Sequence, residues 1–255
     1  MWLRLRQICL VAQELTPAVE DLKSVFGLEV CYVDPGVKAF GLENSLLPVG
    51  NQFLEVVAPI EENTAAGRYL ERRGGDGGYM VITQCDDHPP RRKRVEELGI
   101  RIALRIDRPQ YQGMQLHPRD TGGSFLEIDQ QGGGDAPDGP WWPAGPDWKP
   151  ARRTDVVSAI RAAELQSPDP DRLAHRWSEI VEIPVHRGDA GDPTIALENA
   201  SLRFVEALDG RGEGLGGVDV AVVDRTRLFG AAEERGLRIE DDRVLICGLR
   251  FGPVD

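Results

Sequence analysis

Two glutamates interrupt apolar runs that read as strands, and they are the residues best placed to do chemistry. Glu55 lies in the run FLEV (residues 53–56), and Glu127 lies in the run FLEI (residues 125–128), 72 positions later. Facing carboxylates that leave water need a bound cation, a shared proton or an open, wet cleft. The pair therefore indicates metal or acid–base chemistry, with two solvated edge-strand glutamates as the plain alternative.

The elements that would position these glutamates repeat in the order strand–helix–strand–strand–strand. In the first unit a helix begins with Thr16 as N-cap and Pro17 behind it, and it ends at Gly27. The predicted strands of the first unit are 3–12, 28–33, 37–42 and 51–58, followed by a second helix at 64–73. The second unit has a strand at 79–85, a helix at 91–98 and strands at 100–106, 112–117 and 124–130. Because side chains alternate between strand faces, Glu55 and Glu127 are expected to point into one concavity.

The second half of the chain repeats this order twice more. A strand at 156–165 leads to a helix capped by Asp169, and a later strand at 217–223 leads to a helix at 226–235. Two local echoes favour a duplication: LEN at 42–44 recurs at 197–199, and EELGIRI at 96–102 recurs as EERGLRI at 233–239. The predicted fold class is α+β, with four tandem βαβββ modules paired into curved mixed sheets that form a cup, and helices on the outside.

A linker rich in Gly, Pro and Trp separates the halves. The predicted domains are residues 1–131 (two modules) and 151–255 (a second, degenerate pair), joined by residues 132–150. Repeated Gly and Pro exclude long regular elements from the linker. Because it contains three of the five tryptophans, we expect it to lie pressed against a domain with its indoles buried, either as a clamp or as an aromatic lid.

The composition narrows the function classes. The 255-residue chain has a net charge of -12, which argues against nucleic acid as a partner. The basic run 91–94 is followed by acids and is interpreted as a solvated helix face. The four cysteines lack CxxC spacing, and the apolar run 8–12 is too short for a signal peptide or membrane span. We expect a cytoplasmic protein with a small-molecule ligand and no membrane partner, as a monomer or homodimer.

The βαβββ order resembles that of the vicinal oxygen chelate superfamily, which includes glyoxalases, methylmalonyl-CoA epimerases and extradiol dioxygenases. The segment LHPRDTGGSFLEI (116–128) is similar to the last strands of the epimerases, and Gly50-Asn51 with Glu55 resembles the end of their first module. The close resemblance covers roughly residues 3–131. In the second half, the positions that match the ligands of the dioxygenases hold Ala162, Phe204 and Val218, which indicates a scaffold or lid.

The resemblance implies a divalent metal held by the first and last strands of each module. The matching positions here are Gln7, Glu55, Met80 and Glu127. Met80 replaces the usual histidine and is a poor ligand for such ions. The implied metal ligands are therefore Gln7, Glu55 and Glu127, an oxygen set that suits Mg²⁺, Mn²⁺ or Ca²⁺ better than Zn²⁺.

Two functions stay open. The first is a glyoxalase-like, metal-assisted isomerase or lyase that acts on a small carbonyl-containing metabolite, with Glu127 and Glu55 as catalytic carboxylates. The second is a non-catalytic, sequestration-type binding protein that has lost its metal site, which Met80 and the tryptophan-rich linker favour. For either function, the expected substrate pocket consists of Met80, Tyr79, Phe53, Phe125, Trp141 and Trp142.

Overall fold

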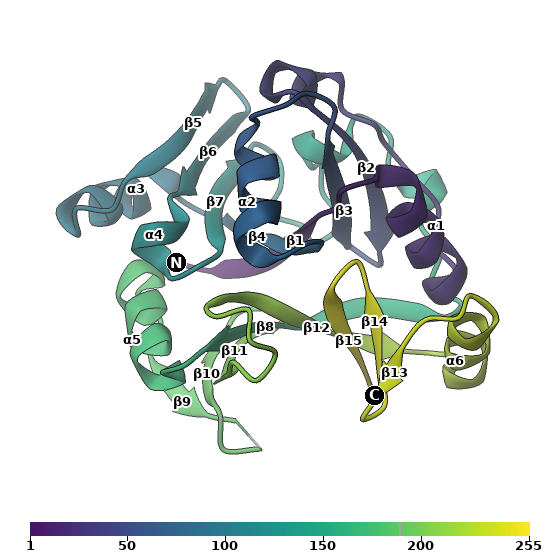
Figure 1. Ribbon diagram of the computed structural model, residues 1–255. Helices are drawn as coiled ribbons and strands as arrows, with labels where there is room; N and C mark the ends of the chain where they lie inside the picture. The colour runs from purple at the N-terminus through teal and green to yellow at the C-terminus, as the bar shows by residue number, and fades with distance from the viewer. Residues whose placement is uncertain (189) are drawn as a thin grey trace. The chain divides into compact units, whose positions relative to one another are not determined.

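The computed structural model describes residues 1–188 and 190–255, and it confirms the predicted α+β class (Figure 1). Its strands form a seven-stranded and an eight-stranded mixed sheet. The first sheet consists of β1 (Leu3–Val11), β2 (Leu42–Val49), β3 (Gln52–Pro59), β4 (Gly77–Cys85), β5 (Ile102–Arg108), β6 (Tyr111–Leu116) and β7 (Phe125–Gln131). The second consists of β8 (Val157–Ser167), β9 (Val185–Arg187), β10 (Pro193–Ala196), β11 (Ser201–Glu206), β12 (Gly214–Val222), β13 (Ile239–Glu240), β14 (Arg243–Ile246) and β15 (Leu249–Val254).

Five of the described helices join these strands at the predicted places, and α4 lies in the segment that was predicted to be a turn. The helices are α1 (Leu15–Phe26), α2 (Ala65–Arg73), α3 (His88–Glu97), α4 (Pro118–Thr121), α5 (Pro170–Val181) and α6 (Arg225–Glu234), with the 3-10 turns η1 (Pro35–Phe40), η2 (Trp142–Ala144) and η3 (Lys149–Ala151). None of the described helices has the length and apolar character needed to cross a membrane.

Local signals account for most helix ends. The Asp169 carboxylate caps α5 by accepting from the Arg172 N–H at 3.0 Å, and Pro170 follows it. Gly27 ends α1 with a left-handed φ of 65°. The predicted N-cap at Thr16 is wrong, because α1 already begins at Leu15.

The order strand–helix–strand–strand–strand is complete in three places: β4-α3-β5-β6-β7, β8-α5-β9-β10-β11 and β12-α6-β13-β14-β15. In the first module the second strand is reduced to one bridge between Tyr32 and Leu46. The strand predicted at 37–42 is wrong, because Asp34 accepts a hydrogen bond from the Gly36 N–H at 2.8 Å and starts the 3-10 turn η1.

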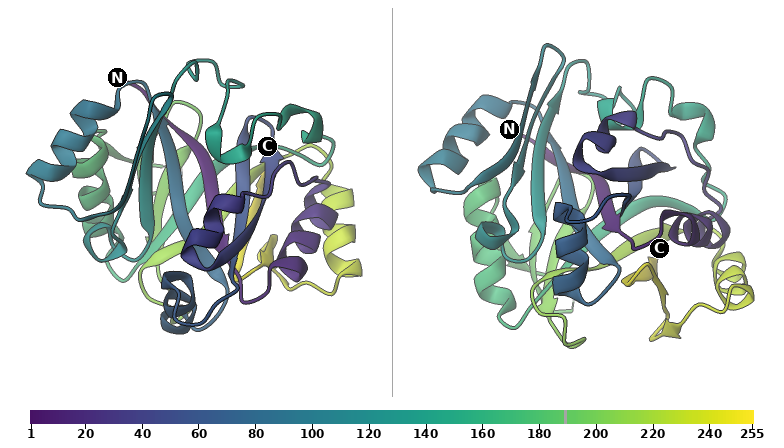
Figure 2. Two further views of the ribbon diagram at one scale, coloured as in Figure 1. Left: turned by 90° about the horizontal axis from the view of Figure 1, so that it is seen from above. Right: turned by 45° about the horizontal axis from the view of Figure 1, so that its top comes forward.

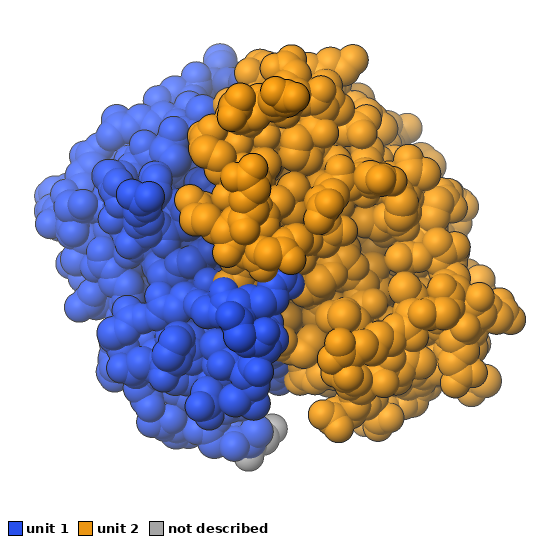
Figure 3. All heavy atoms as spheres, in the orientation of Figure 1, with its two compact units in different colours: residues 1–6, 79–142, 162–215 blue, residues 7–78, 143–161, 216–255 orange. Residues whose placement is uncertain are grey.

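Two compact units divide the chain (Figure 3). Unit 1 consists of residues 1–6, 79–142 and 162–215, and unit 2 of residues 7–78, 143–161 and 216–255. In unit 1, β4 pairs in parallel with β7, and β6 and β5 follow as antiparallel neighbours, while β11 pairs in parallel with β8. In unit 2, β1 and β12 pair in parallel with β3 and β15. Because each unit combines segments of both halves, the division at residues 131 and 151 stays a prediction.

In unit 1, two arginines of the basic run of α3 form cross-links, while Lys93 is solvated as predicted for the run. Arg91 is only 3% exposed, and its guanidinium donates to the backbone oxygens of Val181 and Trp2, both at 3.1 Å. Arg94 donates to the Glu179 oxygen at 3.0 Å. These carbonyls include the unsatisfied ones at the C-terminal end of α5, where cations are stabilising. The arginines therefore join α3 to α5, which lie side by side in Figure 2.

Each part of the linker packs within its own unit. In unit 1, residues 132–141 form a strap held by two buried arginines: Arg4 donates to the Asp135 oxygen at 3.1 Å, and Arg6 donates to the Gly139 oxygen at 3.0 Å. Trp141 is fully buried, with Arg6 over its ring at 5.4 Å. In unit 2, Trp148 packs edge-on against Phe53, with ring centroids 5.1 Å apart. Guanidinium groups thus satisfy carbonyls that a Gly- and Pro-rich segment cannot pair with itself.

Two side-chain amides each donate to, and accept from, the backbone of a single residue in a strand. In unit 1, Asn199 accepts from the Leu5 N–H at 2.9 Å and donates to the Leu5 oxygen at 3.0 Å. In unit 2, Gln52 makes the same pair of bonds to the backbone of Ile160, at 2.8 and 2.9 Å. Each amide thus satisfies one N–H and one carbonyl oxygen of a strand backbone.

Candidate functional site

In unit 2, Glu55 lies on β3 in a cage of neutral donors. Cys9 is its partner on β1, and Gln7 lies two residues earlier on the same face. The Gln7 amide donates to Glu55 Oε2 at 2.8 Å, and the Asn44 amide donates to Glu55 Oε1 at 2.6 Å. The glutamate is 9% exposed. The structure thus brings Gln7 and Glu55 together, as predicted, but through a direct hydrogen bond.

Asn44 is a site residue that sequence reasoning missed. Its Oδ1 accepts the Asp34 N–H at 2.9 Å while its amide nitrogen holds Glu55, so it links the start of η1 to the carboxylate. The available signal was an asparagine in the apolar strand β2, where it pairs with Val57. A buried polar residue in a strand needs a polar partner, and Glu55 is that partner.

Burial raises the pKa of the Glu55 carboxyl above its ordinary value, because the charged form loses water. Hydrogen bonds from the side chains of Asn44, Cys9 and Gln7 act against this rise and lower the pKa. Neutral donors thus offset part of the cost of burying the charge.

In unit 1, Glu127 has an acidic neighbour. Glu127 and Asp129 lie two residues apart on β7 and therefore share one face, and they are 4% and 0% exposed. The Tyr111 hydroxyl donates to Asp129 Oδ2 at 2.6 Å. Burial, followed by the negative charge of Glu127, holds the pKa of Asp129 well above its usual range. The sequence pattern placed Asp129 on this face, but its contacts with Tyr111 depend on the pairing of β6 with β7.

The remaining pocket residues of unit 1 split into two groups. Met80 is partly exposed and pairs with Phe125 in the register of β4 and β7, and Tyr79 packs against Phe125 with ring centroids 5.1 Å apart. Trp141 and Trp142 contact Tyr111 instead, at 5.7 and 5.2 Å. Trp142 is 40% exposed under Arg108, so the prediction that the linker indoles are buried is wrong for this one.

The turn before β7 is structural. His117 Nδ1 accepts the Arg119 N–H at 3.2 Å, and Asp120 accepts from the Arg101 guanidinium at 2.7 Å. Gly122 and Gly123 have φ of 96° and 84°. A side chain on Gly122 would collide with Leu173, and one on Gly123 with the backbone of Glu213. The two glycines are therefore required by close packing and positive φ.

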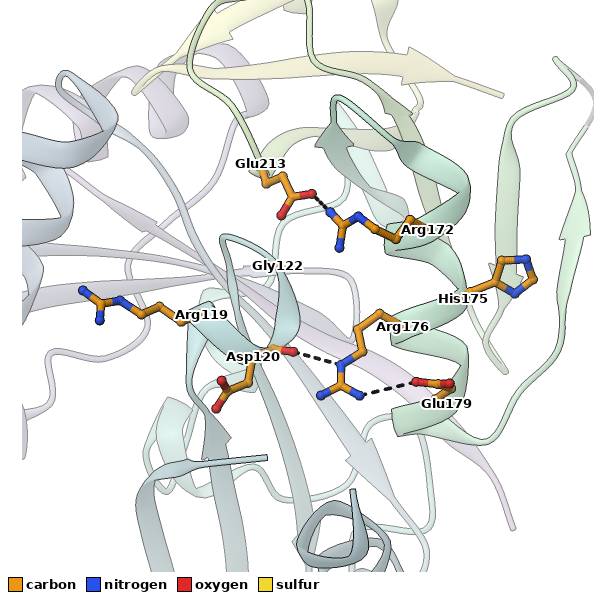
Figure 4. A pocket seen from close by; sticks show the side chains of 8 residues that line it. All are labelled: Arg119, Asp120, Gly122, Arg172, His175, Arg176, Glu179 and Glu213. Atoms are coloured by element: carbon orange, nitrogen blue, oxygen red, sulfur yellow. Dashed lines mark hydrogen bonds and ion pairs between the residues drawn. The ribbon is translucent and has the colours of Figure 1, made fainter. Parts of the chain in front are cut away.

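A hollow of about 500 Å³ lies beside this turn in unit 1, and the sequence did not predict it (Figure 4). Its charges are matched internally: Arg172 pairs with Glu213, while Arg176 donates to the Asp120 oxygen at 3.0 Å and to Glu179 at 3.4 Å. The lining residues are Arg119, Asp120, Gly122, Arg172, His175, Arg176, Glu179 and Glu213. Figure 4 shows Arg119 and His175 turned away from the paired side chains, so few free groups converge there.

The two units differ in the oxygen atoms that they could offer to a metal ion. Both oxygens of Glu55 already accept amide N–H groups, and Gln7 presents its nitrogen to them. In unit 1, Glu127 and Asp129 supply two buried carboxylates, and Asp129 Oδ1 accepts no hydrogen bond from the described residues. No group of three or more His, Cys, Asp or Glu side chains in residues 1–188 and 190–255 is arranged to hold a metal. The two carboxylates of unit 1 are oxygen donors of the kind that hard cations such as Mg²⁺ prefer.

Comparison with known proteins gives the fold and a family match. A family model described as a glyoxalase-like domain matches residues 8–181. A variant of 4-hydroxymandelate synthase from Streptomyces coelicolor aligns with a TM-score of 0.68 at 15% identity, over 93% of this chain and 77% of that chain. Methylmalonyl-CoA epimerases from Streptomyces coelicolor, in complex with 2-nitronate-propionyl-CoA, and from Mycobacterium tuberculosis align at 20% identity. Their TM-scores are 0.45 and 0.44, over 50% of this chain and 96% and 87% of theirs. No curated protein sequence matches significantly.

Proposed function

The chain belongs to the glyoxalase-like domain family of the vicinal oxygen chelate superfamily, and from this premise we propose that its N-terminal half is a metal-assisted isomerase or lyase. The substrate class is a small metabolite with a carbonyl group. The observation that carries the proposal is the set of buried carboxylates on β3 and β7: no arginine or lysine in the described chain donates a hydrogen bond to Glu55 or Asp129.

Glu127 is the proposed general base and acid. Its carboxylate takes the proton from the carbon beside the substrate carbonyl and returns it to the product. A divalent cation, when bound, polarises the substrate carbonyl oxygen. An all-oxygen donor set favours Mg²⁺, Mn²⁺ or Ca²⁺ over Zn²⁺. Gln7 and Glu55 as further ligands of the same cation, and Glu55 as a second catalytic carboxylate, stay predictions.

Met80, Tyr79 and Phe125 are the proposed apolar wall beside Glu127. Met80 and Phe125 are paired across β4 and β7, and Ile82 is the partner of Glu127 in the same register. An apolar wall of this kind removes water from the reacting carbon and strengthens electrostatic interactions nearby.

The alternative is a non-catalytic binding protein, for which Met80 in place of a histidine is the supporting feature. The buried tryptophans support it less, because Trp141 and Trp148 pack against protein side chains and not into an open cleft. Trp142, at the surface, is the indole left to contact a ligand.

The test combines metal content with proton exchange. Elemental analysis of natively purified protein, and thermal unfolding with Mn²⁺ and Mg²⁺, are expected to show a bound divalent cation. NMR in D₂O is expected to show exchange of the α-proton in one member of a panel of small carbonyl compounds. The Glu127→Gln variant should lose exchange by a factor on the order of 10² to 10⁴. No cation, no thermal shift and no exchange in the wild-type protein would leave the binding protein as the function.

A further inference from the structure

The acid pair of unit 1 contains one buried oxygen that lacks a hydrogen-bond donor among the described residues. Glu127 and Asp129 lie on one face of β7, and Asp129 is fully buried. Two buried carboxylates that are both charged repel each other, and both lose their hydration. Their arrangement therefore calls for a positive charge or a proton beside them.

The contacts of Asp129 separate its two oxygens. Oδ2 is held by the Tyr111 hydroxyl at 2.6 Å, whereas Oδ1 is buried without an N–H or O–H donor among the described residues, and the Glu127 carboxyl lies within hydrogen-bonding reach of Asp129. Tyr111 is itself fixed between Asp129 and the ring of Trp141. Its hydroxyl thus fixes the orientation of the carboxylate and leaves Oδ1 as the available ligand atom.

Gly113 makes room for that oxygen. It is the partner of Asp129 in the antiparallel register of β6 and β7, and a Cβ added to it would collide with Asp129 Oδ1. Its φ is not in the left-handed region, so the glycine is not needed for the backbone conformation. The absence of a side chain at position 113 therefore serves the position of the Asp129 carboxylate.

We propose that Asp129 Oδ1, together with Glu127, binds a hard divalent cation of the Mg²⁺ or Mn²⁺ type, and that Asp129 supplies the ligand missing at Met80. The inference rests on the proposed function and extends it by one residue that the family pattern does not include. Carboxylate oxygens are the donors these ions prefer, and two carboxylates leave positions for water and a substrate oxygen. Tyr111 is a positioning residue, because it holds the ligand and not the cation.

The test is Mn²⁺ binding by the full-length protein, measured by EPR and by competition with Mg²⁺. The wild-type chain should bind one Mn²⁺. Asp129→Asn should weaken binding roughly 100-fold, and Tyr111→Phe roughly tenfold, because a lost orienting partner costs less than a lost ligand. Gly113→Ala, which keeps the carboxylate but displaces it, should weaken binding as well. Glu97→Gln, an exposed acid of α3 in the same unit, is the charge-matched control and should bind like wild type.

Circular dichroism and thermal unfolding establish that each variant is folded, and Gly113→Ala provides a second reading where Asp129→Asn unfolds. If Asp129→Asn and Gly113→Ala bind Mn²⁺ like wild type while Glu127→Gln does not, the role of Asp129 is overturned and the proposed function stands. If the wild-type chain binds no Mn²⁺ and yet exchanges the substrate proton, Glu127 and Asp129 share a proton and the cation is overturned. If the wild-type chain shows neither, both proposals fail.

Discussion

The second half of the chain neutralises its buried acids with arginine. Glu164 on β8 accepts from Arg203 on β11 at 2.6 Å, and Asp219 on β12 lies 3.7 Å from Arg243 on β14. In the first half, amides hold the buried Glu55, and a tyrosine holds the buried Asp129. Both halves use the same strand order to present these carboxylates.

This difference separates a structural from a functional use of buried strand carboxylates, which lie on the last strands of the modules (β3, β7) in the first half and on the first strands (β8, β12) in the second. A buried ion pair satisfies both charges within the protein, so nothing further is needed. A buried carboxylate with neutral partners keeps a negative potential that a cation or proton can satisfy. We therefore interpret the second half as scaffold and the first half as the half that keeps the capacity for chemistry.

Arg203→Ala is expected to have the largest effect on this comparison. Removing the guanidinium leaves Glu164 buried without its cation, which should lower the free energy of unfolding by about 3 kcal/mol. Urea denaturation measures the change. Arg187→Ala is the matched control, since Arg187 pairs with Asp171 in an exposed bridge of 2.7 Å and should cost less than about 0.5 kcal/mol. Equal losses in the two variants would mean that the buried ion pair of the second half stabilises the fold no more than an exposed one.

His88 makes the first half sensitive to acid. Burial is the main cause that lowers the pKa of His88 from 6.5 to about 4. Between these pH values the unfolded chain binds more protons than the folded one, so stability is fully present above pH 6.5 and is lost as the pH falls toward 4. The expected loss is about 2 kcal/mol.

Chemical denaturation across pH 4 to 7 tests this expectation with His88→Gln. The variant should show a flatter profile than wild type. His175→Gln and His186→Gln, which replace exposed histidines of the second half, should keep the wild-type slope. A steep profile that survives in His88→Gln would place the acid sensitivity elsewhere.

Removal of the amide should lower the free energy of unfolding more at Gln52 than at Asn199, because Gln52 is buried and Asn199 is exposed. Gln52→Ala leaves the Ile160 backbone without partners in a buried place and should cost about 2 kcal/mol, whereas Asn199→Ala lets water replace the amide and should cost about 1 kcal/mol. Thermal unfolding of both variants measures the ratio. A larger loss for Asn199→Ala would show that the exposed turn between β10 and β11 has the greater structural weight.

Met80→His is the change most specific to the first half. An imidazole in place of the thioether should raise the affinity for Mn²⁺ roughly tenfold and shift selectivity toward Zn²⁺. Isothermal titration calorimetry measures both. The gain should vanish in the double variant with Glu127→Gln, and a gain that persists there would mean that the new histidine binds metal without the carboxylates.

Particular residues show where sequence reasoning succeeded. The echo EELGIRI is structural: Glu97 and Glu234 end α3 and α6, and Ile102 and Ile239 begin β5 and β13, at the same offset. The echo LEN is not, because Asn44 lies in β2 whereas Asn199 lies in the turn after β10. Helix ends depend on nearby residues, so a local pattern is sufficient for them, whereas three matching letters in a strand do not determine register.

Arg91 shows the opposite case. Its sequence context, four basic residues followed by acids, predicts a solvated face, and the structure buries it against the carbonyls of α5. Those carbonyls lie about 90 residues away in the chain, so no local pattern could reveal them. A long side chain is free to bury its stem and head wherever the tertiary fold offers acceptors.

The sequence by itself determined the α+β class, the recurring order of strand and helix, and the placement of Glu55 and Glu127 within buried strands. Alternation and helix-capping are local effects, so they are readable in the chain. The tertiary structure decided what each carboxylate meets: amides for Glu55, Tyr111 for Asp129 and arginine for Glu164. Those partners lie on neighbouring strands of the sheet, 11, 18 and 39 residues away in the chain, and strand register brings them within hydrogen-bonding distance.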